Sequence, residues 1–295
     1  MELRQLRYFL KAKELLNFTE AAAQLFVTQS TLSQQVKQLE QELGVPLFDR
    51  IGKRVALTEA GHLFAVHAQK ALKQAEDGLV AIQDLQELQT GSLQIGVTYG
   101  LRATLSRVLV QFAERYPQVQ IRVIFGTSAE LLQKLQRFEL DFILTFIDQK
   151  PLPLFKYQEL FRSPLVLVTA KNTPSNKPQQ LSVSLETAAQ LPLILPTKGY
   201  STTAFIYDAF QRKNLSPTIV MEINDIPTLL DLVRTGKWQT ILTHTSIQDD
   251  KQLQGIHIKG KDMTKTAMIV SIKESYERKS VLAFWDILFE LGHPQ

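Results

Sequence analysis

Residues 17–44 predict two short helices that meet at a tight turn, and this stretch limits the possible folds more than any other. It reads NFTEAAAQLFVTQSTLSQQVKQLEQELG. Thr19 is placed to cap the first helix, because its hydroxyl can accept an N–H of the opening turn. Phe26 and Val27 form the expected turn, and Thr28 can cap the second helix. An apolar face recurs at helical spacing along the second helix, formed by Leu32, Val36, Leu39 and Leu43.

The opposite face of the second helix carries short hydrogen-bonding side chains and one cation. Its members are Gln29, Ser30, Ser33, Gln34 and Lys37. Glutamine can pair with the edge of adenine, serine with several base edges, and lysine with guanine or phosphate, so this face suits a DNA major groove. A small helical hairpin with a solvated polar face has the same pattern. This stretch alone leaves both interpretations open.

A third helix and a β-hairpin are predicted on either side of this pair. The apolar stripe Leu3, Leu6, Phe9 and Leu10 predicts a helix that shares one core with the other two. Pro46 ends the second helix, and residues 47–57 then form two short extended pieces around a turn at 51–53. Basic side chains near this turn would contact phosphates or enter a minor groove, or serve solubility alone. They are Arg50, Lys53 and Arg54.

From Leu6 to Gly61 the chain resembles the winged helix-turn-helix of LysR-type transcriptional regulators. The matching segments are LRYF at 6–9, NFTEAA at 17–22, QSTLSQQV at 29–36, LGVPLFDR at 43–50 and LTEAG at 57–61. The family commonly has a proline in the opening of the recognition helix, where this chain has Ser30 and Thr31. The resemblance implies a mainly α DNA-binding domain over residues 1–58. It also implies DNA contacts from Thr28, Gln29, Ser30, Ser33, Gln34 and Lys37, and from Arg50 and Arg54 in the wing.

Residues 59–90 predict one long linker helix that serves dimerisation. They contain no proline, and a helix of this length extends about 48 Å at ~1.5 Å per residue. One stripe steps by three or four residues, through Phe64, Ala68, Ala71, Ala75, Leu79 and Ile82. We expect this stripe to pair with a second copy, and the family resemblance implies the same; packing on the chain's own C-terminal domain is the alternative. A dimer would double the recognition helix, as a two-fold operator requires.

Residues 91–295 alternate between strand and helix patterns, which predicts an α/β domain with parallel strands. Strands are expected at 93–97, 120–125, 141–145, 165–168, 193–195, 218–223, 240–243 and 265–272. We expect lobe I at about 91–161 and 267–295, and lobe II at about 162–266, with a cleft between them. This order resembles the effector-binding domain of the LysR family, itself similar to periplasmic solute-binding proteins.

Ligands of such sheets bind at the carboxyl ends of strands, close to helix N-termini. Hydroxyl-rich residues gather at these places, and one lysine adds a positive charge. The candidate effector contacts are Thr98, Tyr99, Thr127, Ser128, Lys198, Ser201, Thr202 and Thr243. Converging hydroxyl and N–H groups favour a small anionic metabolite, although helix capping explains any single one of these residues more often than ligand binding does.

The composition excludes several other classes of function. The chain has no cysteine and its five histidines are scattered, so we expect no disulfide, metal site or other cofactor. The chain has no run of about 20 apolar residues, so we predict no membrane span. The N-terminus lacks a signal-peptide pattern, so the expected location is the cytoplasm. No Gly-x-Ser-x-Gly elbow or P-loop is present, and His244 is the only candidate base. We therefore predict a regulator rather than an enzyme or a transport protein with an appended DNA-binding module.

The predicted partners follow from this interpretation. They are double-stranded DNA, a small-molecule effector, further copies of the chain in a homodimer or homotetramer, and RNA polymerase as an additional candidate. The net charge of +4 is only mild support for a polyanionic partner, and it is not concentrated near the N-terminus. The prediction of DNA binding therefore depends on the motif and not on bulk charge.

Overall fold

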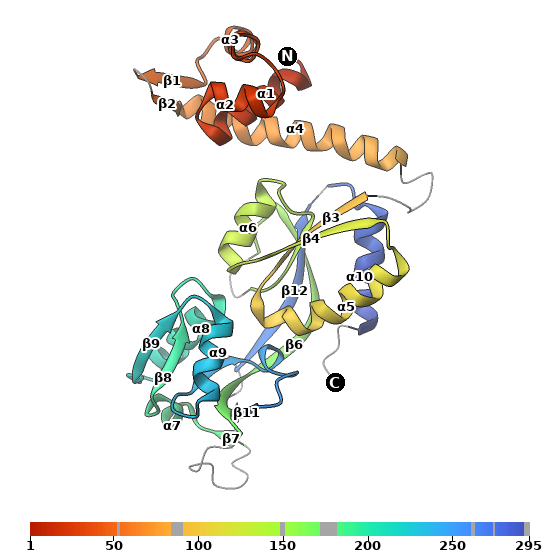
Figure 1. Ribbon diagram of the computed structural model, residues 1–295. Coiled ribbons are helices and arrows are strands. Elements are labelled where there is room, and N and C mark those ends of the chain that lie inside the picture. Colours follow the sequence, from red (N-terminus) through yellow and green to blue (C-terminus); the bar gives the residue numbers. More distant parts are fainter. Residues whose placement is uncertain are drawn as a thin grey trace. The chain divides into compact units, whose positions relative to one another are not determined.

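The structure is a computed structural model, and it describes residues 1–51, 54–83, 91–147, 151–171, 182–260, 263–273 and 275–291. The chain forms two compact units, Met1–Glu87 and Leu88–Gln295. Each unit is considered by itself (Figure 1).

The N-terminal unit is a winged helix-turn-helix. Its elements are α1 (Leu3–Leu15), α2 (Phe18–Gln24), α3 (Gln29–Leu43), β1 (Phe48–Ile51), β2 (Arg54–Leu57) and α4 (Glu59–Gln83). The wing strands β1 and β2 are antiparallel, with Phe48 opposite Leu57. Phe48 links the wing to the helices, because its ring lies 5.6 Å from that of Phe9 and 5.1 Å from that of Phe18. Helices and wing thus share one aromatic core.

Two predictions about helix capping have different outcomes. Thr28 caps α3 as predicted, since its side chain accepts a hydrogen bond from the Thr31 N–H. The prediction for Thr19 is wrong. The α2 helix begins at Phe18, so Asn17 occupies the capping position and its Oδ1 accepts the N–H groups of Thr19 and Glu20 at 3.0 and 3.2 Å.

The long helix α4 uses its apolar stripe in two ways. In its first half, Phe64 and Ala68 pack in the core of the N-terminal unit, and the Phe64 ring lies 5.5 Å from Phe9. In its second half, Leu79 and Ile82 are 61% and 62% exposed. Residues 84–90, also predicted as helix, lie outside the described residues. Among the described residues of the stripe, Ala71, Leu79 and Ile82 are exposed, so the stripe is open to a partner from Ala71 onward.

Lobe I of the C-terminal unit is a mixed sheet with helices on both faces. In it, β3 (Gly91–Val97) lies parallel to β4 (Val119–Phe125) and β5 (Phe142–Phe146), and β5 pairs antiparallel with β12 (Thr264–Ile272). The helices α5 (Arg102–Arg115) and α10 (Lys279–Leu291) share one apolar cluster with the sheet, while α6 (Ser128–Gln136) belongs to another cluster.

In the residues that the structure describes, lobe II contains further strands and helices. They are β7 (Ser182–Val183), α7 (Leu185–Ala189), β8 (Leu193–Pro196), α8 (Ser201–Arg212), β9 (Ile219–Ile223), α9 (Ile226–Arg234), β10 (Thr240–Thr243) and β11 (Leu253–Ile258). The strands β8 and β9 pair in parallel, whereas β10 and β11 both pair antiparallel with β6 (Phe155–Ala170). The α/β class predicted for this domain is confirmed, although its strands are not all parallel.

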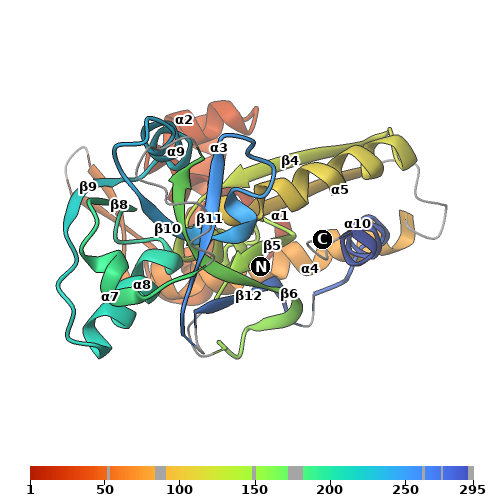
Figure 2. The same ribbon diagram turned by 90° about the horizontal axis from the view of Figure 1, so that it is seen from below.

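The two lobes are joined by two long strands that run side by side. In both views β6 lies beside β12 (Figure 1 and Figure 2), and their pairing extends from Phe155–Ile272 to Pro164–Thr264. The prediction of a strand at 165–168 is therefore too short. The first half of β6 is not predicted from the sequence because it contains charged residues and ends at Pro164. Proline within a strand indicates an edge or a bulge. The pairing does contain a bulge, at Ala267 and Met268.

Candidate DNA-binding face and effector cleft

The recognition helix α3 has one fully buried face and one open face. Leu32, Val36 and Leu39 have no exposed surface. On the open side, the Gln29 Nε2 donates a hydrogen bond to the Ser33 hydroxyl at 2.9 Å, which orders both side chains. The residues predicted for DNA contact are exposed, apart from half-buried Ser33; they are Thr28, Gln29, Ser30, Gln34 and Lys37.

The wing is attached to the recognition helix through a half-buried carboxylate contact. The Glu40 Oε1 on α3 accepts hydrogen bonds from the N–H groups of Leu47 and Phe48 at 2.8 and 3.1 Å. This contact fixes where the wing begins. Arg50 lies in β1 and Arg54 in β2, but their side chains, like the turn at 52–53, lie outside the described part of the chain.

Sequence reasoning treated Phe26 only as a turn residue, and its exposure is unusual. The side chain is 95% exposed and the backbone has φ of 55°, in the left-handed region that few residues other than glycine adopt. A fully exposed phenylalanine contributes nothing to the core of the unit. It lies two residues before Thr28, the N-cap of α3. No sequence signal distinguishes such a residue from a buried turn residue.

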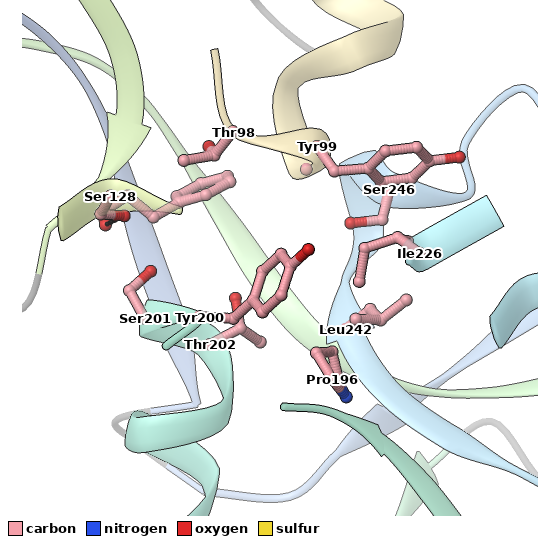
Figure 3. A pocket seen from close by; sticks show the side chains of 12 residues that line it. Thr98, Tyr99, Ser128, Pro196, Tyr200, Ser201, Thr202, Ile226, Leu242 and Ser246 are labelled. Carbon is pink, nitrogen blue, oxygen red and sulfur yellow. Dashed lines mark hydrogen bonds between the residues drawn. The ribbon is translucent and has the colours of Figure 1, made fainter. Parts of the chain in front are cut away.

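A small cavity of about 30 Å³ lies between the two lobes of the C-terminal unit (Figure 3). Ser128 at the start of α6 and Ser201 at the start of α8 border it from opposite lobes. Lobe I contributes Thr98, Tyr99, Gly100, Ser128 and Phe146. Lobe II contributes Pro196, Tyr200, Ser201, Thr202, Ile226, Leu242 and Ser246. Two helix N-termini and five hydroxyl side chains of predicted residues thus meet at one place.

Two larger cavities lie beside the small one, and Tyr200 borders all three. One has a volume of about 640 Å³ and extends between α6 and α8. The other has about 430 Å³ and is lined in part by Arg102 and Asp225. The Tyr200 hydroxyl donates a hydrogen bond to the Asn224 carbonyl oxygen. Burial, then the nearby carboxylates of Glu130 and Asp225, raise the pKa of Tyr200, which keeps the hydroxyl protonated as a donor.

Most of the predicted effector contacts line these cavities, and two do not. Thr98, Tyr99, Ser128, Ser201 and Thr202 border the small cavity, and Lys198 borders the larger one.

Thr127 and Thr243 have other roles in the structure. Thr127 caps α6, where its N–H and hydroxyl both donate to Glu130 Oε2, and these bonds hold the pKa of Glu130 below its usual value. Thr243 is buried, and its hydroxyl bonds that of Ser246, which does border the cavity, at 2.9 Å.

Sequence reasoning missed the apolar wall of the cleft and its one close glycine. Phe146, Ile226 and Leu242 cannot be told from ordinary core residues by pattern alone. Gly100 carries a clearer constraint, since a Cβ there would lie 2.8 Å from the Phe146 ring and 2.9 Å from the Thr243 hydroxyl. Among the described residues no cluster of His, Asp and Glu could hold a metal ion. No described helix is both long and apolar enough to cross a bilayer.

Comparisons with known proteins define the class to which this architecture belongs. A model of bacterial regulatory helix-turn-helix proteins of the lysR family matches residues 3–62, and a model of the LysR substrate binding domain matches residues 86–292. The chain is thus a DNA-binding regulator with an effector-binding domain. It belongs to the LysR family of transcriptional regulators, as the sequence motifs predicted.

Individual relatives match over nearly the whole chain. The HTH-type transcriptional regulator BsdA of Bacillus subtilis (strain 168) is 32% identical over 97% of this chain and 100% of its own length. A full-length OxyR variant from Pseudomonas aeruginosa has 23% identity and a TM-score of 0.76, covering 98% of this chain and 94% of its own. Full-length CbnR in complex with its target DNA has 22% identity and a TM-score of 0.67, covering 98% and 99%. These structures confirm the predicted fold, a winged helix-turn-helix joined to a two-lobed α/β domain.

Proposed function

We propose that α3 reads operator bases and that a small anion bound between the lobes controls this reading. The observation that carries the first part is the two-sided character of α3, since its inner face is fully buried while its outer face offers ordered amide and hydroxyl groups. CbnR, a structural relative, has been seen on its target DNA. The proposed base and backbone contacts are Thr28, Gln29, Ser30, Ser33, Gln34 and Lys37, with Arg50 and Arg54 from the wing.

Replacement of Gln29 by alanine tests base reading. The variant should lose discrimination between an operator half-site and a mismatched site by about 1–3 kcal/mol, because base-edge contacts carry specificity. Competition binding with matched and mismatched duplexes measures this ratio. Gln136→Ala, at an exposed glutamine of α6 in the other unit, is the matched control. A Gln29→Ala protein with unchanged discrimination would refute the assignment.

Replacement of Arg54 by alanine tests the wing. Loss of a phosphate contact should weaken binding to all sequences alike and reduce the salt slope of log K by roughly 0.9. Binding measured over a salt series gives the slope, and Arg107→Ala on α5 serves as the control. An unaltered slope would count against a phosphate contact.

Phe26 lies at the edge of the proposed interface, where its ring would cover deoxyribose or a thymine methyl group. Phe26→Asn should leave the N-terminal unit as stable or slightly more stable, because asparagine tolerates a positive φ better and no buried surface is lost. Operator affinity should fall several-fold. Unchanged affinity would exclude Phe26 from the interface.

The second part of the proposal rests on the convergence of two helix N-termini on the small cavity. A carboxylate there would accept hydrogen bonds from Thr98 and Ser201 and from the opening N–H groups of α6 and α8. Lys198 would add a positive charge. Ser201 is the clearest position to test, because Ser128 already bonds Thr145 and the Phe146 carbonyl. Ser201→Ala should weaken stabilisation of the protein by small carboxylates, with Ser106→Ala on α5 as the control.

Control of DNA binding follows if the anion binds one arrangement of the lobes better than another. The shift in the lobe equilibrium cannot exceed this difference in binding free energy. We propose action in the cytoplasm, where chromosomal DNA lies, with RNA polymerase as a further partner. An effector-dependent change in operator affinity, measured with the wild type and Ser201→Ala, tests this coupling. If operator affinity is the same with and without each ligand that the protein binds, the proposed coupling is contradicted.

A further inference from the structure

Two serine side chains border the small cavity from opposite lobes, and buried hydroxyl groups lie behind each of them. Ser128 belongs to lobe I and Ser246 to lobe II, on opposite sides of the cavity (Figure 3). Four further hydroxyl residues behind these serines are at most 1% exposed; they are Thr145, Ser163, Thr243 and Thr245. Burial of a hydroxyl group is unfavourable unless it finds a hydrogen-bond partner, so the partners of these groups matter.

In lobe I the hydroxyl chain is short and consists of Ser128 and Thr145. Their hydroxyl groups bond each other at 2.7 Å, and Thr145 is fully buried in β5. In the sheet, Thr145 lies opposite Met268 of the long strand β12. The lobe I hydroxyl chain therefore connects the cavity to β12 through one threonine.

In lobe II the hydroxyl chain is longer and consists of Ser246, Thr243, Thr245 and Ser163. The Ser246 and Thr243 hydroxyls bond each other at 2.9 Å, and Thr245 donates to Thr243 at 3.3 Å. Ser163 of β6 donates to the Thr245 hydroxyl at 3.4 Å and accepts the Thr245 N–H at 3.3 Å. O–H···O bonds usually measure about 2.7–2.8 Å, so these longer links are weak and a small rotation makes or breaks them.

The lobe II hydroxyl chain also fixes the segment through which lobe II contacts lobe I. Thr245 is the middle residue of the 3-10 turn η3 (His244–Ser246), which contacts η2 (Tyr99–Leu101) of lobe I. The bonds between Thr245 and Ser163 attach this turn to β6. The angle between the lobes therefore depends on how η3 is held on β6.

The two hydroxyl chains end on opposite sides of the bulge in the strands that join the lobes. The register of β6 against β12 shifts next to Met268, so that Leu160 of β6 is skipped in the pairing. The lobe I hydroxyl chain reaches β12 at Met268, whereas the lobe II hydroxyl chain reaches β6 at Ser163, on the lobe II side of Leu160. A bulge disrupts the ladder locally and bends the strand, so paired strands turn most easily at this point.

We propose that the lobes turn about the bulge at Leu160 and that the two hydroxyl chains set their angle. A group that enters the cavity at Ser128 or Ser246 would change the bonds of one hydroxyl chain and thereby the preferred angle. Thr145 and Ser163 are thus positioning residues. The proposal rests on the proposed control of DNA binding for its biological role, but the positioning itself requires no ligand.

Interlobe distances in the ligand-free, full-length protein test this role. Because the sequence contains no cysteine, Gln133→Cys on α6 and Gln211→Cys on α8 place one spin label on each lobe. Both glutamines are exposed. An excess of unlabelled protein suppresses distances between copies, and double electron–electron resonance then gives the distribution of distances between the lobes.

Ser163→Ala and Thr145→Val each remove one link and leave both cavity serines in place. Each should shift the populations of short and long interlobe distances about fivefold, the effect of losing one ordinary hydrogen bond. Thr145→Ser keeps the hydroxyl and should retain the wild-type distribution. Thr169→Val is the matched control, since Thr169 is a buried threonine of β6 whose hydroxyl bonds Gln254, outside both hydroxyl chains.

Hydrogen exchange locates the pivot. In Ser163→Ala and Thr145→Val, the amides of residues 159–161 should exchange about fivefold faster, while those of residues 166–168 in the lobe II part of β6 keep their rates. Lower unfolding stability with an unchanged distance distribution would show that the hydroxyl groups serve packing alone, and would overturn the proposal. Faster exchange along all of β6 would overturn the placement of the pivot. Either failure leaves the proposed anion site untouched, because no ligand is present.

Discussion

Gly61 and Gly78 lie in the same helix, α4, and differ in what surrounds them. A Cβ at Gly61 would lie 2.1 Å from the Leu47 carbonyl oxygen and 2.8 Å from the Leu57 side chain. At Gly78 such an atom would have no neighbour within 4 Å. Gly61 therefore allows the start of α4 to approach the wing, whereas Gly78 only adds backbone freedom.

This difference predicts opposite effects of the same substitution. Gly61→Ala should destabilise the N-terminal unit by about 2–3 kcal/mol, because a backbone atom must move. Gly78→Ala should stabilise it by about 0.5–1 kcal/mol, as expected in a helix interior. Denaturant unfolding measures both. A Gly61→Ala protein as stable as the wild type would disprove the close approach.

Asp250 gives lobe II a pH-dependent contribution to stability. Burial alone would raise its pKa, but hydrogen bonds from the Arg234 side chain and from the N–H groups of Gln252 and Leu253 prevail and lower it. Because the folded pKa lies below the unfolded one, the contribution is complete above about pH 4 and is lost as the pH falls through the folded pKa.

Asp250→Asn should therefore cost about 1–2 kcal/mol at pH 7 and progressively less in acid. Thermal unfolding from pH 7 to pH 3 measures the difference, with Asp249→Asn as the neighbouring control. A cost that stays constant over this range would contradict the role of the Asp250 charge.

At the scale of elements, the two lobes contact each other where Tyr99–Leu101 meets His244–Ser246. Both segments are single 3-10 turns, η2 and η3, and Gly100 is the middle residue of η2, facing Thr243 and Ser246. Gly100→Ala would place a methyl group against Phe146 and Thr243, so the lobes must separate. We expect effector affinity to fall about 10-fold while effector-free DNA binding persists, with Gly78→Ala as the control. Unchanged effector affinity would show that the lobes do not close around this glycine.

The sequence predicted most elements but not the way the lobes are joined. Helix α3 was predictable because its buried and open faces follow one period, and the Thr28 cap marks its start. The first half of β6 was not, since Pro164 and its charged neighbours obscure a strand that is held by pairing with β12. The short strand β11 also escaped prediction. Its residues Gly255 and His257 interrupt the apolar alternation, and pairing with β6 determines its conformation.

At the scale of the whole molecule, the second half of α4 is the part of the predicted stripe that is open to another copy. Leu79→Glu should weaken self-association and lower affinity for a two-half-site operator by at least 10-fold, while affinity for one half-site changes little. Sedimentation and operator binding measure the two effects, and Leu152→Glu is the control at another exposed leucine. If the Leu79→Glu variant self-associates as strongly as the wild type, the interface lies elsewhere.

The candidate sites differ in how far the sequence predicts them. The DNA-binding face lies within one helix and its wing, so adjacent residues carry its whole signal. The cleft combines Thr98, Ser128 and Ser201, which are far apart in the chain and are brought together only by the two lobes. Hydroxyl residues at strand ends indicated these positions. The apolar residues that line the neighbouring cavity are brought together by tertiary packing, which no local sequence pattern predicts.

The most direct test of the central claim is binding of the purified protein to the intergenic DNA beside its own gene. It should be measured at two salt concentrations, with excess competitor DNA. We predict tight binding that resists competitor, weakens with salt and changes when a bound carboxylate is present. Binding that competitor abolishes, at both salt concentrations and with every carboxylate tested, would contradict a sequence-reading regulator acting at this DNA.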